Sequence, residues 1–226
     1  MSGDAAASAL LREGIALLGI ANPAGTFEKL ESYIAELEHA NPRLGLVKYE
    51  DRRELIVKHV LDSLSAWGVL RDAAGPGPAT VLDAGSGAGF PGIPLAIALP
   101  GWSFVLLERM AKRAAFLKTC AILLGLSNAK VIQRDLVDLS GKYDLVTCRA
   151  FAPLERLVED LRKSGVRWRK IAAYKGREER VREEIDDVRR LTGGRIASEV
   201  VAVKSPFLNE ARCMVVLSSD PLLTNG

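Results

Sequence analysis

The chain has 226 residues, which is long enough for one substantial α/β domain with a smaller extension. Apolar residues make up 48% of it and charged residues 26%, and its formal net charge of +3 is too small to indicate a nucleic-acid partner by itself. It contains no run of apolar residues long enough to span a membrane, and no basic segment precedes an apolar stretch as in a secretion signal. We therefore expect a soluble, cytoplasmic protein that does not bind a membrane.

The three cysteines, Cys120, Cys148 and Cys213, are far apart and form no paired motif, and only two histidines could join them around a metal. Free cysteine is among the most buried residue types. We therefore expect core thiols in a reducing compartment and no bound metal.

The first part of the chain predicts helices. A capped, amphipathic segment begins at Thr26 and is expected to end before Asn41-Pro42, because the residue before a proline is biased away from the helical conformation. Further helices are predicted over residues 5–20 and 50–70. The segment Gly75-Pro76-Gly77-Pro78 then breaks this pattern. We therefore place a helical extension at residues 1–75, the main domain at 76–220 and a tail at 221–226.

From residue 80 onward, short β-branched runs alternate with helical segments, as in a doubly wound parallel sheet. Seven strands are predicted, over residues 80–84, 103–107, 129–134, 143–148, 170–174, 196–204 and 212–218. Helices are predicted over residues 91–99, 111–124, 153–164 and 177–191. Too few residues separate the last two strands for a crossover helix, so these strands should form an antiparallel hairpin. The prediction is a Rossmann-like α/β fold of class I methyltransferase type: a seven-stranded, mostly parallel sheet with an antiparallel last strand.

A glycine-rich loop follows the first predicted strand. It reads Asp83-Ala84-Gly85-Ser86-Gly87-Ala88-Gly89-Phe90-Pro91-Gly92, and its glycines let the backbone approach a ligand closely. Its end satisfies GxGxxG, the dinucleotide fingerprint, so an NAD(P)-dependent oxidoreductase is an alternative. In that fold, however, the first glycine follows the strand almost directly. Here the match starts beyond Asp83, whose carboxylate would repel a pyrophosphate.

Three acids, Asp83, Glu108 and Asp135, stand at the ends of the first three predicted strands, where doubly wound sheets bind ligands. Carboxylates suit a cation, and S-adenosylmethionine carries a sulfonium and an ammonium but no phosphate. Glu108 is placed to accept from the ribose hydroxyls and Asp135 lies near the adenine edge, with Leu136 and Val137 available to contact the ring. Each acid alone could equally be a loop or cap residue. With the glycine loop they favour S-adenosylmethionine as the cofactor.

Several segments resemble the bacterial 16S ribosomal RNA guanine-N7 methyltransferases, the small-subunit methyltransferase G family, once named for glucose-inhibited division protein B. The most specific is the glycine loop with its continuation Phe90-Pro91-Gly92-Ile93-Pro94, which methyltransferases in general do not share. Lys58-His59-Val60-Leu61-Asp62-Ser63, Arg149-Ala150-Phe151 and Tyr174-Lys175-Gly176 are similar to three further family segments. The resemblance runs from about residue 41 to residue 217.

This resemblance implies methyl transfer from S-adenosylmethionine to N7 of a guanine in the 530 loop of 16S rRNA. N7 has a lone pair and no proton, so attack on the methyl group needs no general base. Arg149 and Lys175 are expected to be the catalytic residues, which orient the guanine or its phosphates as a fork and as a point charge. The cofactor site is expected at Asp83, Gly85, Gly87, Phe90, Glu108, Asp135, Leu136, Val137 and Arg149.

RNA contacts are expected at His59, Lys175 and Arg177. Between Arg162 and Arg182, nine basic residues stand against two acids, which suits either a phosphate backbone or a solvated helix face. For His59 the alternative is a hydrogen bond to a neighbouring acid such as Asp62, which could itself tie the helices to the sheet. We expect a monomer whose partner is 16S rRNA or the small ribosomal subunit. A non-catalytic ribosome-assembly factor is the other alternative.

Overall fold

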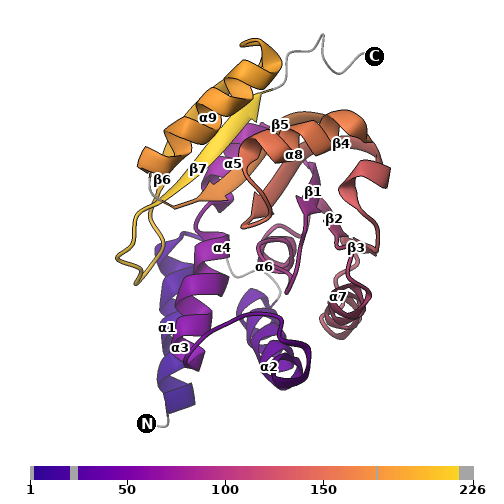
Figure 1. Cartoon of the computed structure of the whole chain (residues 1–226). Coiled ribbons are helices and arrows are strands. Elements are labelled where there is room, and N and C mark those ends of the chain that lie inside the picture. Colours follow the sequence, from indigo (N-terminus) through magenta and orange to yellow (C-terminus); the bar gives the residue numbers. More distant parts are fainter. Residues whose placement is uncertain (1–2, 21–24, 177, 219–226) are drawn as a thin grey trace.

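The computed structural model describes residues 3–20, 25–176 and 178–218 (Figure 1). The predicted tail at residues 221–226 and the predicted RNA contact Arg177 lie outside these residues. All three cysteines are buried and none forms a disulfide, as expected of core thiols.

Within the described ranges, six short or medium helices precede the sheet. They are α1 (Gly3–Leu17), α2 (Thr26–Leu44), α3 (Arg52–Leu55), the π-helical turn η1 (Ile56–Leu61), α4 (Asp62–Leu64) and α5 (Trp67–Ala74). The prediction that the second helix ends before Asn41-Pro42 is wrong, since α2 continues through Pro42. The helix ends at Leu44, with Gly45 as its C-cap residue. The Asn41 side chain, still inside the helix, accepts from the N–H groups of Leu46 and Val47 and so holds the segment that follows.

The single helix predicted over residues 50–70 is divided in the structure. It begins at an N-cap, where the Asp51 carboxylate accepts from the Glu54 N–H at 2.7 Å. The chain then widens into η1, and it turns at Ser65 and Ala66 before α5 starts. Apolar residues on two faces of this segment are buried, among them Leu55, Leu61 and Leu64, so it packs against both α1 and the sheet layer.

The seven strands form one sheet in the order β3-β2-β1-β4-β5-β7-β6. They are β1 (Thr80–Ala84), β2 (Ser103–Leu107), β3 (Ala129–Ile132), β4 (Ser140–Arg149), β5 (Gly165–Lys175), β6 (Ala197–Val203) and β7 (Arg212–Ser218). Pairings from β3 to β5 are parallel, and β7 pairs antiparallel with both β5 and β6. The predicted sheet and its antiparallel last strand are confirmed.

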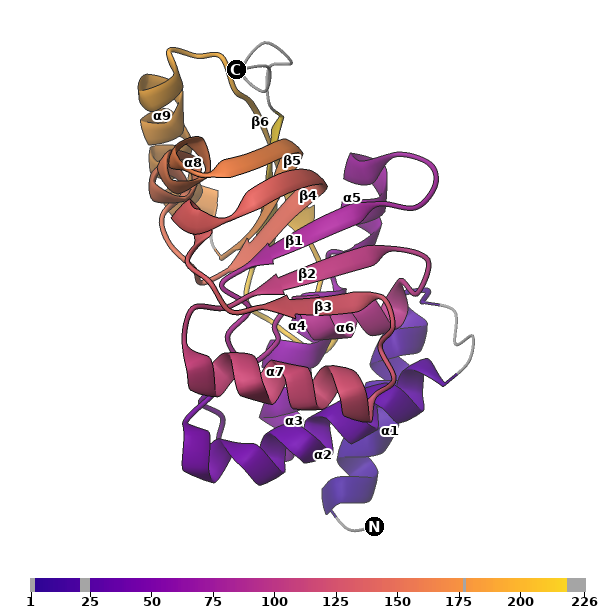
Figure 2. The same ribbon diagram turned by 90° about the vertical axis from the view of Figure 1, so that its right-hand side faces the viewer.

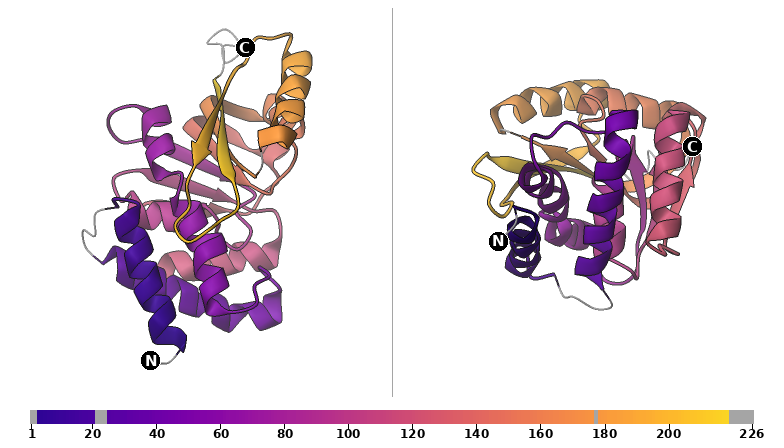
Figure 3. Two further views of the ribbon diagram at one scale, coloured as in Figure 1. Left: turned by 90° about the vertical axis from the view of Figure 1, so that its left-hand side faces the viewer. Right: turned by 90° about the horizontal axis from the view of Figure 1, so that it is seen from below.

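Helices cover both faces of this sheet. The helices between strands are α6 (Gly92–Ala98), α7 (Ala111–Leu123), α8 (Leu154–Lys163) and α9 (Glu178–Thr192). Figures 1 and 2 show α8 and α9 on one side, with α6, α7 and the N-terminal helices on the other. Figure 3 shows that the loop between β6 and β7 reaches the N-terminal helices.

The N-terminal helices share one hydrophobic core with the sheet. Leu11, Leu30 and Leu61 are fully buried in the same cluster as Phe104 of β2 and Met214 of β7. Close packing requires small residues there: a Cβ on Gly14 of α1 would lie 2.5 Å from a methyl carbon of Leu61. The N-terminal helices are therefore packed into the same core as the sheet.

Candidate functional site

Two acids hold the glycine loop from the ends of β1 and β2. Glu108 is buried and accepts from the Gly87 N–H at 3.0 Å and, through its other oxygen, from the Met110 N–H at 2.8 Å. Asp83 is fully buried, and its Oδ2 accepts from the Gly92 N–H at 3.1 Å in the first turn of α6. The loop is thus fixed near its middle and at its end before any ligand arrives.

Three glycines of the loop have left-handed backbone, with φ of 71° at Gly85, 58° at Gly87 and 105° at Gly89. Space is short as well. A Cβ on Gly85 would lie 2.2 Å from a ring carbon of Phe151, and one on Gly89 would lie 2.9 Å from the Tyr33 hydroxyl. The Phe151 ring therefore lies directly on the bare backbone of Gly85, where no side chain fits.

Asp83 occupies the position that the dinucleotide alternative assigns to a pyrophosphate. In that alternative the amides of the first helical turn bind phosphate oxygens. Here the amide of Gly92, the last glycine of the GxGxxG match, is bound by Asp83, and a Cβ on Gly92 would lie 2.5 Å from the same carboxylate oxygen. The space beside Gly92 is therefore filled by the Asp83 carboxylate and not by a phosphate, which argues against a nicotinamide cofactor.

Burial raises the pKa of Asp83 from 3.8 to about 7. Its second oxygen, Oδ1, is buried and has no hydrogen-bond partner. An incompletely paired carboxylate in a buried site is stabilised by a cation or a donor group nearby. Asp83 is fully buried and is not among the residues that line the cavity described next, so in this structure it holds the loop and does not face the cavity.

A cavity of about 360 Å³ lies beside the loop at the carboxyl ends of the strands, within the size range of small-molecule sites. The predicted cofactor residues that line it are Gly85, Glu108, Asp135 and Leu136. Sequence reasoning assigned no role to the other side chains that line it, which include Met110, Arg113, Phe151 and Asp160. Phe151 lies within the Arg149-Ala150-Phe151 segment, so its family motif was the one signal that could have identified it.

Arginines surround the acidic wall of this cavity. Arg109 Nη1 lies 3.8 Å from Asp135 Oδ2, and Arg156 Nε lies 3.0 Å from Asp160 Oδ2. The side chains of Arg109 and Arg156 are 76% and 58% exposed, and Arg134 is also exposed at the cavity. The mouth of the cavity is therefore basic, although the acids Glu108, Asp135 and Asp160 line the cavity.

Leu136 and Val137 lie in the short helical turn η2 (Leu136–Asp138) after β3. Leu136 is 2% exposed and lines the cavity, whereas Val137 is half-buried and is not among the residues that line it. Of this predicted pair, only Leu136 is brought to the cavity.

Three other predicted site residues gather on the opposite side of the loop. The Phe90 ring contacts His59, with ring centroids 5.4 Å apart, and the Arg149 guanidinium lies 4.9 Å from the Phe90 centroid.

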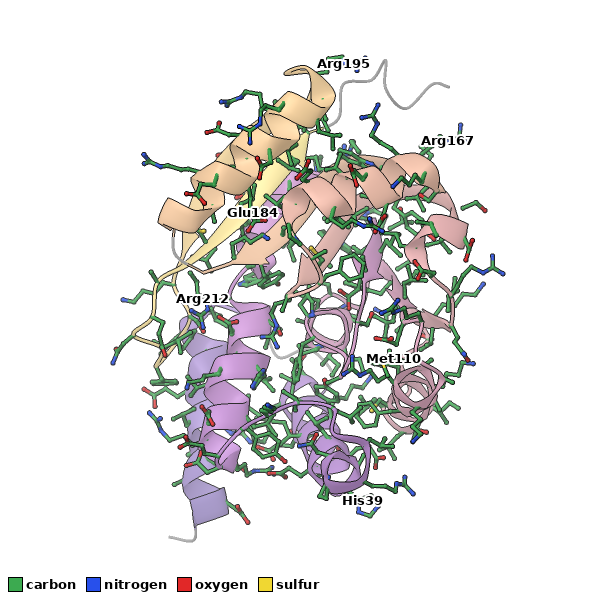
Figure 4. The ribbon with its side chains drawn as sticks, in the orientation of Figure 1. His39, Met110, Arg167, Glu184, Arg195 and Arg212 are labelled. Atoms are coloured by element: carbon green, nitrogen blue, oxygen red, sulfur yellow. The ribbon has the colours of Figure 1, made fainter. Side chains whose placement is uncertain are left out.

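Arg149 Nη1 lies 3.2 Å from Asp62 Oδ2, while Asp62 Oδ1 accepts from Arg212 Nε at 3.0 Å. We call Asp62, Arg149 and Arg212 the Asp62 cluster; Figure 4 labels Arg212 beside the N-terminal helices. Arg149 thus does not line the cavity.

The Asp62 cluster ties the helices to the sheet, as the sequence analysis suggested for Asp62. Asp62 is 5% exposed and joins the end of β4 to the start of β7. Next to it, the Tyr174 hydroxyl at the end of β5 donates to the Ser63 carbonyl at 2.5 Å. The suggested hydrogen bond between His59 and Asp62 is not formed, because His59 pairs with Arg149 instead.

Lys175 ends β5 and forms an ion pair with a residue of α9. Its Nζ lies 2.6 Å from Glu184 Oε2, an oxygen that also accepts from the Leu154 N–H at 2.8 Å. Lys175 therefore joins three elements and does not line the cavity. Figure 4 shows Glu184 on the side of α9 that faces α8.

The basic stretch from Arg162 to Arg182 does not form one continuous face within the described part of the chain. Arg167 is exposed near the start of β5 and Lys175 ends the same strand, so eight residues, about 27 Å of extended chain, separate them. Figure 4 shows Arg167 well away from Glu184, the ion-pair partner of Lys175. The stretch is divided between the two ends of the sheet.

Residues 26–210 match the family described as rRNA small subunit methyltransferase G. The chain belongs to this family. The ribosomal RNA small subunit methyltransferase G of Treponema pallidum (strain Nichols) is 38% identical over 220 residues, which cover 92% of this chain and 93% of that protein. The protein of the same name from Borrelia hermsii (strain HS1 / DAH) is 38% identical over 175 residues, which cover 77% and 83%.

Solved structures show the same fold at lower identity. A human methyltransferase 10 domain containing protein aligns with a TM-score of 0.58 at 17% identity, over 85% of this chain and 97% of that one. Magnesium protoporphyrin IX methyltransferase from Synechocystis PCC 6803 with bound SAM aligns with a TM-score of 0.53 at 20% identity, over 83% and 97%.

Membership in the methyltransferase G family confirms the predicted enzyme class and S-adenosylmethionine as the methyl donor. Among the described residues, no helix has both the length and the apolar character to cross a bilayer. Nor do three or more histidine, cysteine or acidic side chains gather in that part of the chain where they could hold a metal ion.

Proposed function

We propose that this member of the methyltransferase G family methylates N7 of a guanine in the 530 loop of 16S rRNA. The proposal is carried by one arrangement at three adjacent strand ends: Asp83 and Glu108 hold the glycine loop, and Glu108 and Asp135 line the cavity of about 360 Å³ beside it. The relatives from Treponema and Borrelia, which are named ribosomal RNA small subunit methyltransferases, support the choice of RNA as substrate.

The acids of the cavity supply acceptors for the methyl donor. Each oxygen of Glu108 holds one backbone N–H and can accept a second hydrogen bond, which suits the two ribose hydroxyls. Asp135, at the mouth, accepts from the adenine amine, and Leu136 contacts the ring. Bound there, S-adenosylmethionine supplies an electrophilic methyl group.

The target atom requires little acid–base chemistry of the protein. N7 of guanine attacks through its own lone pair, so the residues act by orienting the base and by stabilising the cationic product. Arg149 and Lys175 orient the guanine or its phosphates. In this structure they are paired with Asp62 at 3.2 Å and Glu184 at 2.6 Å, so RNA must take over part of each pairing.

The proposed partner is 16S rRNA, alone or within the small subunit, and the proposed active form is a cytoplasmic monomer. A monomer suffices because one chain supplies every residue described at the cavity. Lys175 and Arg177 are proposed RNA contacts.

Methyl transfer to RNA tests this function. Purified protein is incubated with S-adenosylmethionine and with unmethylated small subunits or naked 16S rRNA, and the RNA digests are read by mass spectrometry. We expect one N7-methylguanosine in the fragment that holds the 530 loop. Binding to subunits without methylation would favour an assembly factor instead. Enhanced fluorescence of a reduced nicotinamide on mixing would favour the oxidoreductase.

A further inference from the structure

His59 lies in the π-helical turn η1, and this turn presents backbone carbonyls to Arg149. π-Helical turns are rare and occur frequently at functional sites. Arg149 Nη1 donates to the carbonyls of Lys58 at 3.2 Å and His59 at 3.4 Å, in addition to its ion pair with Asp62. The turn therefore holds the guanidinium from the helical side of the molecule.

Both ring nitrogens of His59 are engaged within the chain. Nδ1 lies 3.0 Å from Arg149 Nη2, and Nε2 lies 3.2 Å from the Lys48 carbonyl. Since arginine can only donate, Nδ1 must accept, and the ring proton must be on Nε2, where it donates to the carbonyl. Burial, and secondarily the charge of Arg149, lowers the pKa of His59 to about 4, which agrees with a neutral ring.

The ring of His59 also belongs to the enclosure around Phe90. That phenyl ring contacts Tyr33 edge-on at 5.6 Å, His59 at 5.4 Å and the Arg149 guanidinium at 4.9 Å. Tyr33 donates in addition to the Ala88 carbonyl of the glycine loop at 2.7 Å. Residues of the N-terminal helices thus set the position of the loop that borders the donor cavity.

We propose that His59 is a positioning residue of the donor site, which holds Arg149 by accepting its hydrogen bond and holds Phe90 by packing on its ring. The proposal rests on the proposed function of the site. We propose this role in place of a direct RNA contact by His59, because both ring nitrogens and one ring face already make contacts inside the protein.

Donor affinity measured without RNA tests this role. S-adenosylhomocysteine, the demethylated donor, is titrated calorimetrically into His59→Phe, which keeps the packing on Phe90 and loses the acceptor, and into His59→Asn, whose amide oxygen replaces Nδ1. We expect Kd to rise at least tenfold in the first variant and less than threefold in the second. The matched control is His39→Phe, the same change at the exposed histidine of α2, which should bind as the unaltered chain does.

Thermal unfolding of each variant checks that it folds. If His59→Phe does not fold, His59→Asn is compared with His59→Gln, whose amide group reaches toward the Nε2 position, and only the second should lose affinity. Unchanged donor affinity together with a raised KM for RNA would overturn the proposal in favour of RNA contact. Equal losses in the Asn and Phe variants would overturn the role of the hydrogen bond. If the unaltered chain binds no S-adenosylhomocysteine, the proposed function fails first.

Discussion

Gly85 combines two demands that only glycine meets. Its φ of 71° is left-handed, and the Phe151 ring occupies the space of a Cβ at 2.2 Å. Gly125 offers a matched comparison, because its φ of 57° is similar while nothing lies within 4 Å of its missing Cβ. The two positions separate backbone strain from steric exclusion at the donor site.

We expect Gly85→Ala to displace Phe151 and to weaken S-adenosylhomocysteine binding at least tenfold, and Gly85→Asp to abolish it. Gly125→Ala should cost about 1 kcal/mol of stability from the left-handed backbone and leave donor binding intact. Calorimetric titration and urea unfolding of the variants measure both effects. Similar donor affinity in Gly85→Ala and Gly125→Ala would contradict the role assigned to the space above Gly85.

Asp83 makes the stability of the protein depend on pH. Between its ordinary pKa of 3.8 and the folded value of about 7, the folded chain holds a proton that the unfolded chain releases. The free energy of unfolding therefore decreases as pH rises through this window. We expect Asp83→Asn to lack this component, which amounts to at most about 3 kcal/mol between pH 5 and pH 8. Urea unfolding of the unaltered chain and of Asp83→Asn at the two pH values measures this component. An identical pH dependence of the free energy of unfolding in the two proteins would argue against burial of an ionisable Asp83.

At the scale of elements, strands were easier to predict than helix boundaries. The strand β5 was expected only over residues 170–174, where four of the five residues are apolar. Residues 165–169 also belong to β5, and their side chains alternate between exposed and buried. Seen in the sequence alone, a charged residue such as Arg167 is as typical of a loop as of a strand. The π-helical turn η1 could not be predicted, since its sequence fits an ordinary α-helix and its carbonyls meet Arg149, ninety residues away in the sequence.

The candidate site shows the same division. Acids at strand ends were predictable because parallel strands end at one edge of a sheet, and Glu108 and Asp135 indeed line the cavity. The positions of Arg149 and Lys175 were not, because their partners lie on helices that only the fold brings to the strand ends: Asp62 is 87 residues from Arg149, and Glu184 is on the next helix, nine residues after Lys175. Long side chains at a strand end can point to the cavity or away from it, and tertiary pairing decides between the two.

The loop and helix after β2 carry a basic side chain that we expect RNA to contact. Arg113, in the first turn of α7, lines the cavity and forms no ion pair with any residue in the described ranges. We expect Arg113→Ala to lower RNA affinity roughly fivefold and to reduce the salt dependence of binding by about one ion. Arg167→Ala, the same change at the far end of β5, is the control and should bind normally. Equal effects of the two changes in a filter-binding series at several salt concentrations would exclude a localised RNA path.

At the scale of the whole molecule, the helical extension and the sheet have a common core. Leu30 and Leu61 of the helices are fully buried together with Phe104 of the sheet, and the Asp62 cluster crosses the same boundary. Among the described residues, the helices predicted as an extension over residues 1–75 therefore share one core with the sheet. We expect them to fold as one unit with residues 76–220.

We accordingly expect one cooperative unfolding transition. A variant that keeps Trp67 as its single tryptophan reports on the helices, and one that keeps only Trp168 reports on the sheet. In urea, each fluorescence midpoint should coincide with the circular dichroism midpoint of the same variant. An earlier transition at Trp67 than at Trp168 would show that the helices unfold on their own.

The place of β7 between β5 and β6 makes the order of biosynthesis matter. Synthesis runs from the N-terminus, so β6 emerges from the ribosome before the strand that must lie between it and β5. Until residues 212–218 follow, a nascent chain exposes the β5 edge from Lys170 to Lys175, an open template for pairing with another molecule. Asp62 lacks its partner Arg212 over the same interval. A premature stop codon before residue 212 would therefore produce an aggregation-prone fragment in which this edge of the sheet is never closed.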